Sequence, residues 1–318
     1  MRQERDTNTA HILASDEVAG SETNPAADAQ RTGSPIQGFY ADPDLTVFDS
    51  QYFLYPTTDG FEEWVGTTFR VFTSGDLVDW QDRGVILDLS TDVSWASGQA
   101  WAPAISRRDG KYYFYFTAES NIGVAVSDSP TGPFVDSGRP LVADGDFSGR
   151  AIDPSIFRDD DGTFYLIWGN GDAHLVPLEA DMVSFAPENV VTWTPTDFRE
   201  AAWVHKRNGI YYLSWSVNDT RDANYRVLYA TSTSLHGPWI DHGVLLEKDE
   251  GRGIIATGHH SIVNIPGSDE WVIAYHRFGI PSGDGFHREV EFDRLHHTDD
   301  GLIEKVSPSL QSLRLPLS

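Results

Sequence analysis

The sequence predicts an all-β fold, a five-bladed β-propeller with four-stranded antiparallel blades around a central channel, over residues 35–318. Three observations support this prediction. One unit of two strands joined by a turn occurs five times, the turns have hairpin chemistry, and no useful stretch of residues 35–318 has helical periodicity. A two-sheet sandwich is the alternative, but it gives no reason for a fivefold repeat.

The five repeats begin with comparable residues and are regularly spaced. They lie at residues 41–56, 101–117, 152–169, 200–216 and 258–276. Their lead residues are Asp42, Trp101, Asp153, Glu200 and His259, which are 59, 52, 47 and 59 residues apart. Such a period is typical of one four-stranded blade for each repeat.

Turn residues separate the two strands of each repeat. They are Asp49-Ser50, Asp109-Gly110, Asp161-Gly162, Asn208-Gly209 and the longer stretch 266–269. Pairs of this kind favour β-hairpins. Alternating runs at residues 69–80, 122–134 and 226–239 are expected to supply outer strands.

The sequence also indicates where in the cell the protein is expected to act. Residues 1–34 are small, polar and charged without apolar periodicity, and predict a disordered leader ahead of a single domain. No apolar run approaches the roughly 18 residues of a membrane span, and no signal peptide is visible. We therefore expect no membrane association and favour a cytoplasmic location over secretion. The absence of cysteine excludes disulfides and thiolate chemistry.

The net charge of −25 comes from 33 Asp and 15 Glu against 19 Arg and only 4 Lys. Such a surface repels nucleic acid, so we expect no nucleic-acid partner. Repulsion among carboxylates destabilises a chain in dilute buffer, whereas at 1 M salt the Debye length falls to about 3 Å. The composition therefore indicates a halophilic protein, and an ordinary acidic protein is the alternative.

Three of the five lead residues are acids. The innermost strands of a propeller line its axis, so Asp42, Asp153 and Glu200 are expected to meet at one end of the channel, ringed by Trp101 and His259. Neighbouring carboxyls raise each other's pKa, so that one can stay protonated while another is ionised. This pairing suits glycoside hydrolysis. The alternatives are ordinary Asp-Pro turns and a sugar-binding propeller without catalysis, although a binder has no need of three buried acids.

Motifs over residues 35–312 resemble glycoside hydrolase family 43, whose five-bladed propellers act on arabinose- and xylose-containing polysaccharides. They are YADPD, WAPAI, GKYYFYF, GVAVSDSPTGPF, IDPSIFRDDDGTFYLIWG, EAAWVHKRNGIYYLSWS, TGHHSIV and HREVEFDRL. The resemblance implies that Asp42 is the general base, that Glu200 is the general acid, and that Asp153 orients Glu200 and raises its pKa. The family inverts the anomeric configuration, so we expect the carboxyls of Asp42 and Glu200 to be roughly 6.5–9.5 Å apart.

The resemblance also implies residues around the sugar. Arg288 matches an arginine that reaches the sugar, and Arg277 is the alternative for that role. Trp101, with Phe61 and Trp64, is expected to wall the subsite at which a sugar stacks. Packing between blades is the alternative for these aromatic side chains.

His259 matches a family histidine on the axis that contacts a calcium ion or a water cluster. The alternative is a histidine hydrogen-bonded in the channel floor, because calcium prefers oxygen ligands. His260 points to the opposite side of the strand and is expected to be structural. No organic cofactor is implied.

The resemblance leaves the sugar open among α-L-arabinofuranosidases, β-D-xylosidases, endo-arabinanases and galactofuranose-active relatives. Stretches 55–60, 206–213 and 257–261 look most like exo-acting arabinofuranosidases. The loops at 216–226 and 278–290 are long enough to wall a pocket, which favours the release of single terminal sugars. Related retaining fructosidases have a cysteine after the acid, where this chain has Ala201, so fructosides are not favoured.

Overall fold

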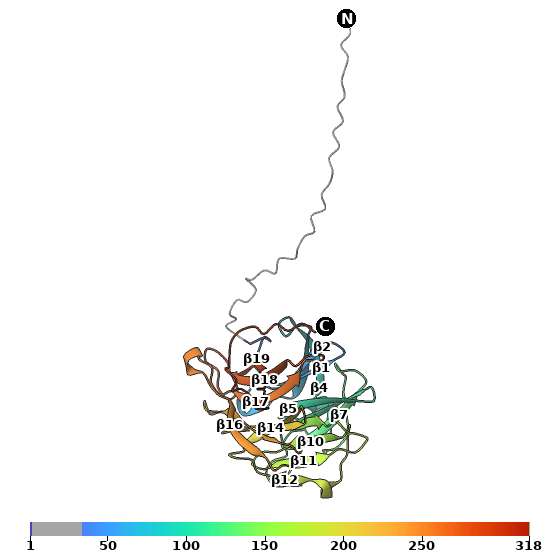
Figure 1. Ribbon diagram of the computed structural model, residues 1–318. Helices are drawn as coiled ribbons and strands as arrows, with labels where there is room; N and C mark the ends of the chain where they lie inside the picture. Colours follow the sequence, from blue (N-terminus) through green and yellow to red (C-terminus); the bar gives the residue numbers. More distant parts are fainter. Residues whose placement is uncertain (2–33, 318) are drawn as a thin grey trace.

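The computed structural model describes Met1 and residues 34–317, which form five antiparallel sheets in a ring (Figure 1). The predicted five-bladed propeller is confirmed. The predicted leader lies outside the described residues, apart from Met1 and Ser34. No helix in the described part of the chain is long and apolar enough to cross a membrane.

The strands follow the chain from blade to blade. The first blade contains β1 (Tyr40–Phe48), β2 (Gln51–Thr58), β3 (Thr68–Ser74) and β4 (Trp80–Asp88), and the second contains β5 (Trp101–Arg108), β6 (Lys111–Ala118), β7 (Asn121–Ser127) and β8 (Val135–Asp136). The third contains β9 (Ser155–Arg158), β10 (Phe164–Trp168), β11 (Ala173–Pro177) and β12 (Val191–Trp193). The fourth contains β13 (Glu200–Arg207), β14 (Ile210–Val217), β15 (Arg226–Ser232) and β16 (Ile240–Leu246), and the fifth contains β17 (Gly258–Asn264), β18 (Trp271–Phe278) and β19 (Arg288–Leu295). The helices are single turns: η2 (Glu62–Trp64), α1 (Leu89–Asp92), η3 (Pro187–Asn189) and η4 (Glu250–Arg252).

The fifth blade departs from the predicted four strands, because its sheet has three strands in the described residues. After β19 the chain makes a short hairpin, in which the N–H of Thr298 donates to the carbonyl oxygen of Leu302 (2.9 Å). Val306 then forms a parallel bridge to Leu246 of the fourth blade. The segment that follows β19 is therefore engaged by the neighbouring blade.

The first and last blades close the ring. In Figure 1 the blue strands of the first blade lie beside the red strands of the last. Leu45 of β1 donates its N–H to the hydroxyl of Ser261 in β17 (3.0 Å), and Leu315 near the C-terminus donates its N–H to the carbonyl oxygen of Asp76 (2.9 Å). Contacts between the two ends of the chain therefore hold the propeller closed.

Tight turns join the inner hairpins where the turn residues predicted them. Both central residues have positive φ in Asp49-Ser50 (46° and 58°) and in Asn208-Gly209 (52° and 80°). These angles define type I′ turns, whose twist matches that of a hairpin. In the third blade Asp161-Gly162 lies within a longer connection, residues 159–163.

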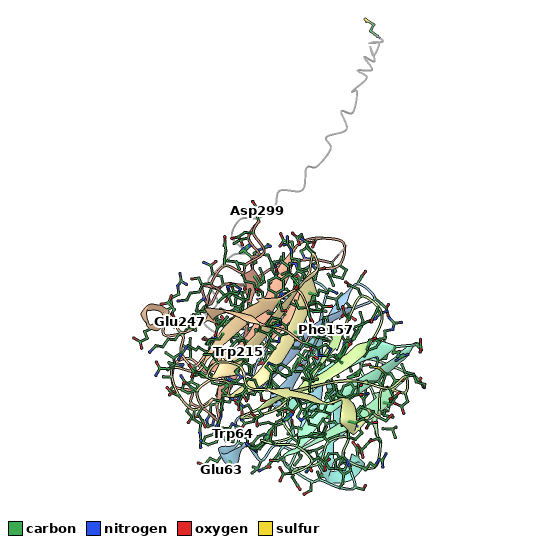
Figure 2. All side chains as sticks on the ribbon, turned by 60° about the horizontal axis from the view of Figure 1, so that its bottom comes forward. Glu63, Trp64, Phe157, Trp215, Glu247 and Asp299 are labelled. Carbon is green, nitrogen blue, oxygen red and sulfur yellow. The ribbon has the colours of Figure 1, made fainter. Side chains whose placement is uncertain are left out.

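Aromatic side chains fill the space between blades. Tyr55 of β2 and Phe114 of β6 are fully buried, with ring centroids 5.9 Å apart. Phe157 and Trp215 belong to a comparable cluster between the third and fourth blades, and Figure 2 labels both. This packing fixes the innermost strands around the axis.

An irregular residue near the start of each innermost strand corrects the predicted equivalence of the lead residues. The strand register shifts there in β1, β5, β13 and β17. In each blade one residue at this point has a positive φ. These residues are Asp42 (48°), Ala102 (45°), Asp153 (59°), Ala201 (58°) and His259 (45°). Trp101 and Glu200 therefore lie one residue earlier than the predicted match. A bulge of this kind re-aims side chains, because a one-residue shift turns a side chain to the other face.

Hydroxyl side chains join three of these bulges to the preceding blade. The bulge N–H groups donate to hydroxyls at the end of the preceding second strand: Ala102 to Thr57 (2.7 Å), Asp153 to Thr117 (3.1 Å) and His259 to Ser216 (2.9 Å). Each pair satisfies a buried backbone donor that the irregular register leaves without a strand partner. These bonds also set the spacing of adjacent blades at the axis.

The other two junctions place polar groups in the channel. Where the ring closes, His276 takes the place of the hydroxyl, and its Nδ1 lies 3.3 Å from the backbone nitrogen of Asp42. In the third blade Gly169 follows β10 and donates its N–H to the carbonyl oxygen of Ile152 (2.9 Å). It offers no side chain, and the N–H of Ala201 donates to the carboxyl group of Asp153 instead.

Candidate active site

A cavity of about 130 Å³ opens at the end of the axis where the innermost strands begin. Seven of the eight predicted site residues line it: Asp42, Trp64, Trp101, Asp153, Glu200, His259 and Arg288. Figure 2 marks this side of the molecule by Trp64, opposite the hairpin that carries Asp299. Phe61, the eighth residue, is 43% exposed and does not line the cavity. Its predicted role as a wall of the sugar subsite is therefore not supported.

Asp42 lies beside the guanidinium of Arg288 and two histidine rings. Its Oδ1 is 3.1 Å from Nη1 of Arg288, 3.2 Å from Nδ1 of His259 and 3.0 Å from Nδ1 of His276, and its Oδ2 accepts a hydrogen bond from Thr57 (2.8 Å). Burial alone would raise the pKa of Asp42, but Arg288, His259 and His276 together hold the pKa well below its usual value. Asp42 is therefore a carboxylate at neutral pH and can accept a proton.

Glu200 has the opposite character. Its Oε1 accepts a hydrogen bond from the hydroxyl of Tyr225 (2.8 Å), and its Oε2 accepts one from Nδ2 of Asn170 (2.7 Å). Burial raises the pKa of Glu200 and the charge of Asp42 adds to that, against the lowering effects of Tyr225 and Arg199. Glu200 therefore keeps its proton at a pH at which Asp42 has lost its own.

Asp153 is a third buried carboxyl, 5% exposed. Burial first, and then the neighbouring Glu200 and Asp42, raise its pKa well above the usual value. Its Oδ2 has no hydrogen-bond partner in the described part of the chain. Asp153 and Glu200 thus interact as buried carboxyls, and the role of Asp153 in orienting Glu200 and raising its pKa stays a prediction.

His259 contacts the acids rather than forming a metal cage. Its Nδ1 lies 3.2 Å from Oδ1 of Asp42 and 3.9 Å from Oδ2 of Asp153, and burial lowers its pKa. Among residues 34–317, no three His, Asp or Glu side chains gather as a metal-binding group. Calcium takes six to eight oxygen ligands, so these side chains do not hold it on their own. An axial calcium ion stays a prediction, and the geometry pairs His259 with Asp42.

Of the two arginines considered for contact with the sugar, Arg288 is the one that lines the cavity. Its Nε lies 2.8 Å from Oδ2 of Asp59, and its Nη1 reaches Asp42. Arg277 does not line the cavity: it is fully buried, and it pairs with Glu289 (2.7 Å) and Glu291 (3.2 Å). The alternative that placed Arg277 at the sugar is therefore wrong. The structural reading of His260 agrees with its hydrogen bond to Ser214 (2.6 Å).

An aromatic wall closes one side of the cavity. The indole N–H of Trp101 donates to the carbonyl oxygen of Trp64, and that of Trp64 donates to the carbonyl oxygen of Gly285 (both 2.8 Å). Guanidinium groups cover the two rings, with Arg221 5.5 Å from the Trp64 ring centre and Arg150 5.7 Å from that of Trp101. The predicted walling loops of the fourth and fifth blades thus both reach this wall.

Sequence reasoning missed several residues of the site. The further lining residues are Arg150, Ile152, Arg199, Asp219, Thr220 and Arg221. Three of them belong to a loop that was predicted to wall the pocket, and two directly precede a predicted acid in the chain. Arg150 has no motif that would have marked it. Behind the lining, Thr57, Asn170 and Tyr225 hold the carboxyls, and only cross-strand register could have placed them there.

Gly258 lets Tyr225 reach the acid. A Cβ at Gly258 would lie 2.3 Å from Cε1 of Tyr225, so only a glycine allows the ring to lie against this backbone. We expect Gly258→Ala to displace Tyr225 from Glu200 and to lower kcat about tenfold or more, with a loss of roughly 1–3 kcal/mol of stability. Kinetics and thermal unfolding measure the two effects. Unchanged kinetics would contradict the role of Tyr225.

A five-bladed propeller whose axis holds an ionised carboxylate and a protonated carboxyl in one small cavity has the pair of groups that a glycoside hydrolase needs. The sequence model of Glycosyl hydrolases family 43 matches residues 32–303. The chain belongs to this family, as its motifs predicted, and is a glycosyl hydrolase.

Characterised relatives differ in the sugars that they are named for. A β-D-galactofuranosidase of Aspergillus niger is 34% identical over 303 residues, covering 89% of this chain and 87% of the relative. Xylosidase/arabinosidase 43A of Humicola insolens is 32% identical, covering 85% of this chain and 97% of the relative. A solved β-xylosidase/α-arabinofuranosidase from a compost microbial metagenome, in complex with xylotriose and in a calcium-free form, has 31% identity and a TM-score of 0.75, covering 88% and 98% of the two chains.

Proposed function

We propose that this chain is an exo-acting, inverting α-L-arabinofuranosidase that releases terminal sugars from arabinose-containing oligosaccharides and polysaccharides. The observation that carries the proposal is the opposite shift of two pKa values in one cavity, lowered for Asp42 and raised for Glu200. A glycosidase needs an ionised carboxylate and a protonated carboxyl at the same pH, and the inverting outcome is what the family resemblance implies.

In the proposed reaction the oxygen of a water molecule attacks the anomeric carbon, and Asp42 takes a proton from that water. The bond between the anomeric carbon and the glycosidic oxygen breaks, and its electron pair stays on the leaving oxygen, which takes the proton of Glu200. Both carboxyls then exchange a proton with solvent and return to their starting states. The two buried carboxyls of Asp153 and Glu200 interact, and like-charge repulsion disfavours ionising both together.

The walls of the cavity support removal of one terminal sugar at a time. The volume of about 130 Å³ is well below the roughly 300–1,000 Å³ of sites for drug-sized ligands. Asp219, Thr220 and Arg221 from the fourth blade close the side that faces Trp64. The small volume and this wall support an exo-acting enzyme over an endo-acting one.

The preference for arabinofuranose rests on the stretches 55–60, 206–213 and 257–261, of which the first contributes Thr57 and Asp59 to the site and the last contributes Gly258 and His259. The relative from Aspergillus niger supports a furanoside as well, because β-D-galactofuranose has the ring configuration of α-L-arabinofuranose with an added exocyclic carbon. β-D-Xylosidase is the second candidate, supported by the relatives whose names include xylosidase.

The test compares aryl α-L-arabinofuranoside, β-D-galactofuranoside and β-D-xylopyranoside in dilute buffer and in molar salt. We expect kcat/KM to be highest for the arabinofuranoside, by about tenfold or more, and activity to rise with salt because screening relieves carboxylate repulsion. Preference for the xyloside would replace the sugar and keep the mechanism. Full activity and stability without salt would contradict the proposed adaptation to high salt. No hydrolysis of any of the three substrates would contradict the proposed exo-acting activity.

A further inference from the structure

We propose that Thr57 is a positioning residue for the general base, because its hydroxyl holds Asp42 in the orientation and the ionised state that proton abstraction needs. This inference rests on the proposed function, since it assigns a role within that reaction. It is carried by the contacts of Thr57 and by a comparison with the equivalent residues of other blades.

The contacts of Thr57 determine where its hydroxyl proton points. Thr57 lies in β2 and is 1% exposed. Its Oγ1 accepts the backbone N–H of Ala102 (2.7 Å) and lies 2.8 Å from Oδ2 of Asp42. A backbone N–H can only donate and a carboxylate can only accept, so the hydroxyl proton is directed at Asp42.

Asp42 is thereby held at both oxygens. Arg288, His259 and His276 surround Oδ1, whereas Thr57 is the described donor at Oδ2. Without Thr57 the carboxylate could turn about its Cβ–Cγ bond, because all its remaining partners are on one oxygen. A hydrogen bond to the charged form also favours that form, so Thr57 keeps the base ionised.

A comparison with the second blade distinguishes this role of Thr57 from a purely structural one. Thr117 lies at the equivalent position of the second blade, and its hydroxyl accepts the N–H of Asp153 (3.1 Å). The described part of the chain gives the hydroxyl of Thr117 no carboxylate contact. A hydroxyl at this position therefore serves the junction between blades in both cases, and donation to a carboxylate is specific to Thr57.

The experiment compares Thr57→Val, Thr57→Ser and Thr117→Val by kinetics over pH. Both valine variants remove a hydroxyl that caps a bulge, so both should lose thermal stability. We expect only Thr57→Val to lower kcat, by about 10- to 100-fold with KM nearly unchanged, and to move the acidic limb of the profile to higher pH. Thr57→Ser should restore both. Identical profiles for the two valine variants, or no restoration by serine, would overturn the proposal.

A second measurement is independent of turnover. The carboxyl carbon of Asp42 is titrated by NMR in aspartate-labelled protein, with Asp42→Asn assigning the signal. We expect a higher pKa for Asp42 in Thr57→Val than in the wild type or in Thr117→Val, and an unchanged pKa would overturn the proposal. If the wild type hydrolyses no substrate, the proposed function fails while this titration still decides the role of Thr57. Thr57→Cys, which keeps a weaker donor, gives the same comparison if Thr57→Val does not fold.

Discussion

Glu200→Gln is expected to lower kcat/KM for an arabino-oligosaccharide by about 10²–10⁴-fold, because the amide cannot protonate the leaving oxygen. The loss should be much smaller for dinitrophenyl arabinofuranoside, whose leaving group departs as a stable anion. The raised pKa of Glu200 also sets the basic limb of the profile, since the rate falls as the pH rises through that pKa and the acid loses its proton. This limb should disappear in the variant. Initial rates on both substrates over pH measure these effects.

The substitution is designed to leave the fold unchanged. Glutamine has the shape of glutamate, Asn170 can still donate to its oxygen, and the hydroxyl of Tyr225 can turn to accept from its amide. Glu247→Gln is the matched control, because Glu247 pairs with Lys305 and lies at the edge of the molecule in Figure 2, away from Trp64. An equal loss on both substrates would point to a structural defect, and full activity on the oligosaccharide would remove Glu200 from the role of acid.

The fold was largely predictable because short sequence patterns determine it. Turn pairs such as Asn208-Gly209 determine each hairpin, and their repetition determines the number of blades. The register at the axis was not predictable in the same way. The equivalent residues are those with positive φ near the start of each innermost strand, so Ala201, and not Glu200, is the equivalent of Asp42. The bridge of Val306, after β19, to Leu246 of the fourth blade is also a non-local contact that no sequence pattern predicts.

The three carboxyls at the axis were predictable, and the residues that support them were not. Asp42, Asp153 and Glu200 were marked by their place in the repeat, because acids are costly at buried positions without a function. Tyr225 and Asn170 contact Glu200 from other segments of the chain, at separations of 25 and 30 residues. No spacing rule relates such residues, since only the assembled ring brings them together.

Asp42→Asn is expected to lower kcat by about 10³–10⁴-fold on every substrate, including the dinitrophenyl glycoside, because the base acts on water and not on the leaving group. This contrast with Glu200 assigns the two roles. Arg288 keeps Asp59 as its partner (2.8 Å), so the variant leaves no unpaired buried guanidinium and should fold. In the wild type the lowered pKa of Asp42 means that activity is lost in acid only as the pH falls through that low value.

Asp42→Ala in the presence of azide tests whether Asp42 acts on the attacking side of the anomeric carbon, and the wild-type product tests the stereochemistry. Azide is small enough to replace the water and needs no base, so it should restore part of the activity and form β-L-arabinofuranosyl azide from the α-glycoside. NMR of the wild-type reaction, recorded before mutarotation, should likewise show the β-sugar first. An α-configured product in the wild-type reaction would mean that a covalent intermediate forms, which requires carboxyls only about 5–5.5 Å apart. Asp42 would then be the nucleophile, and the base assignment would fail while Glu200 could remain the acid.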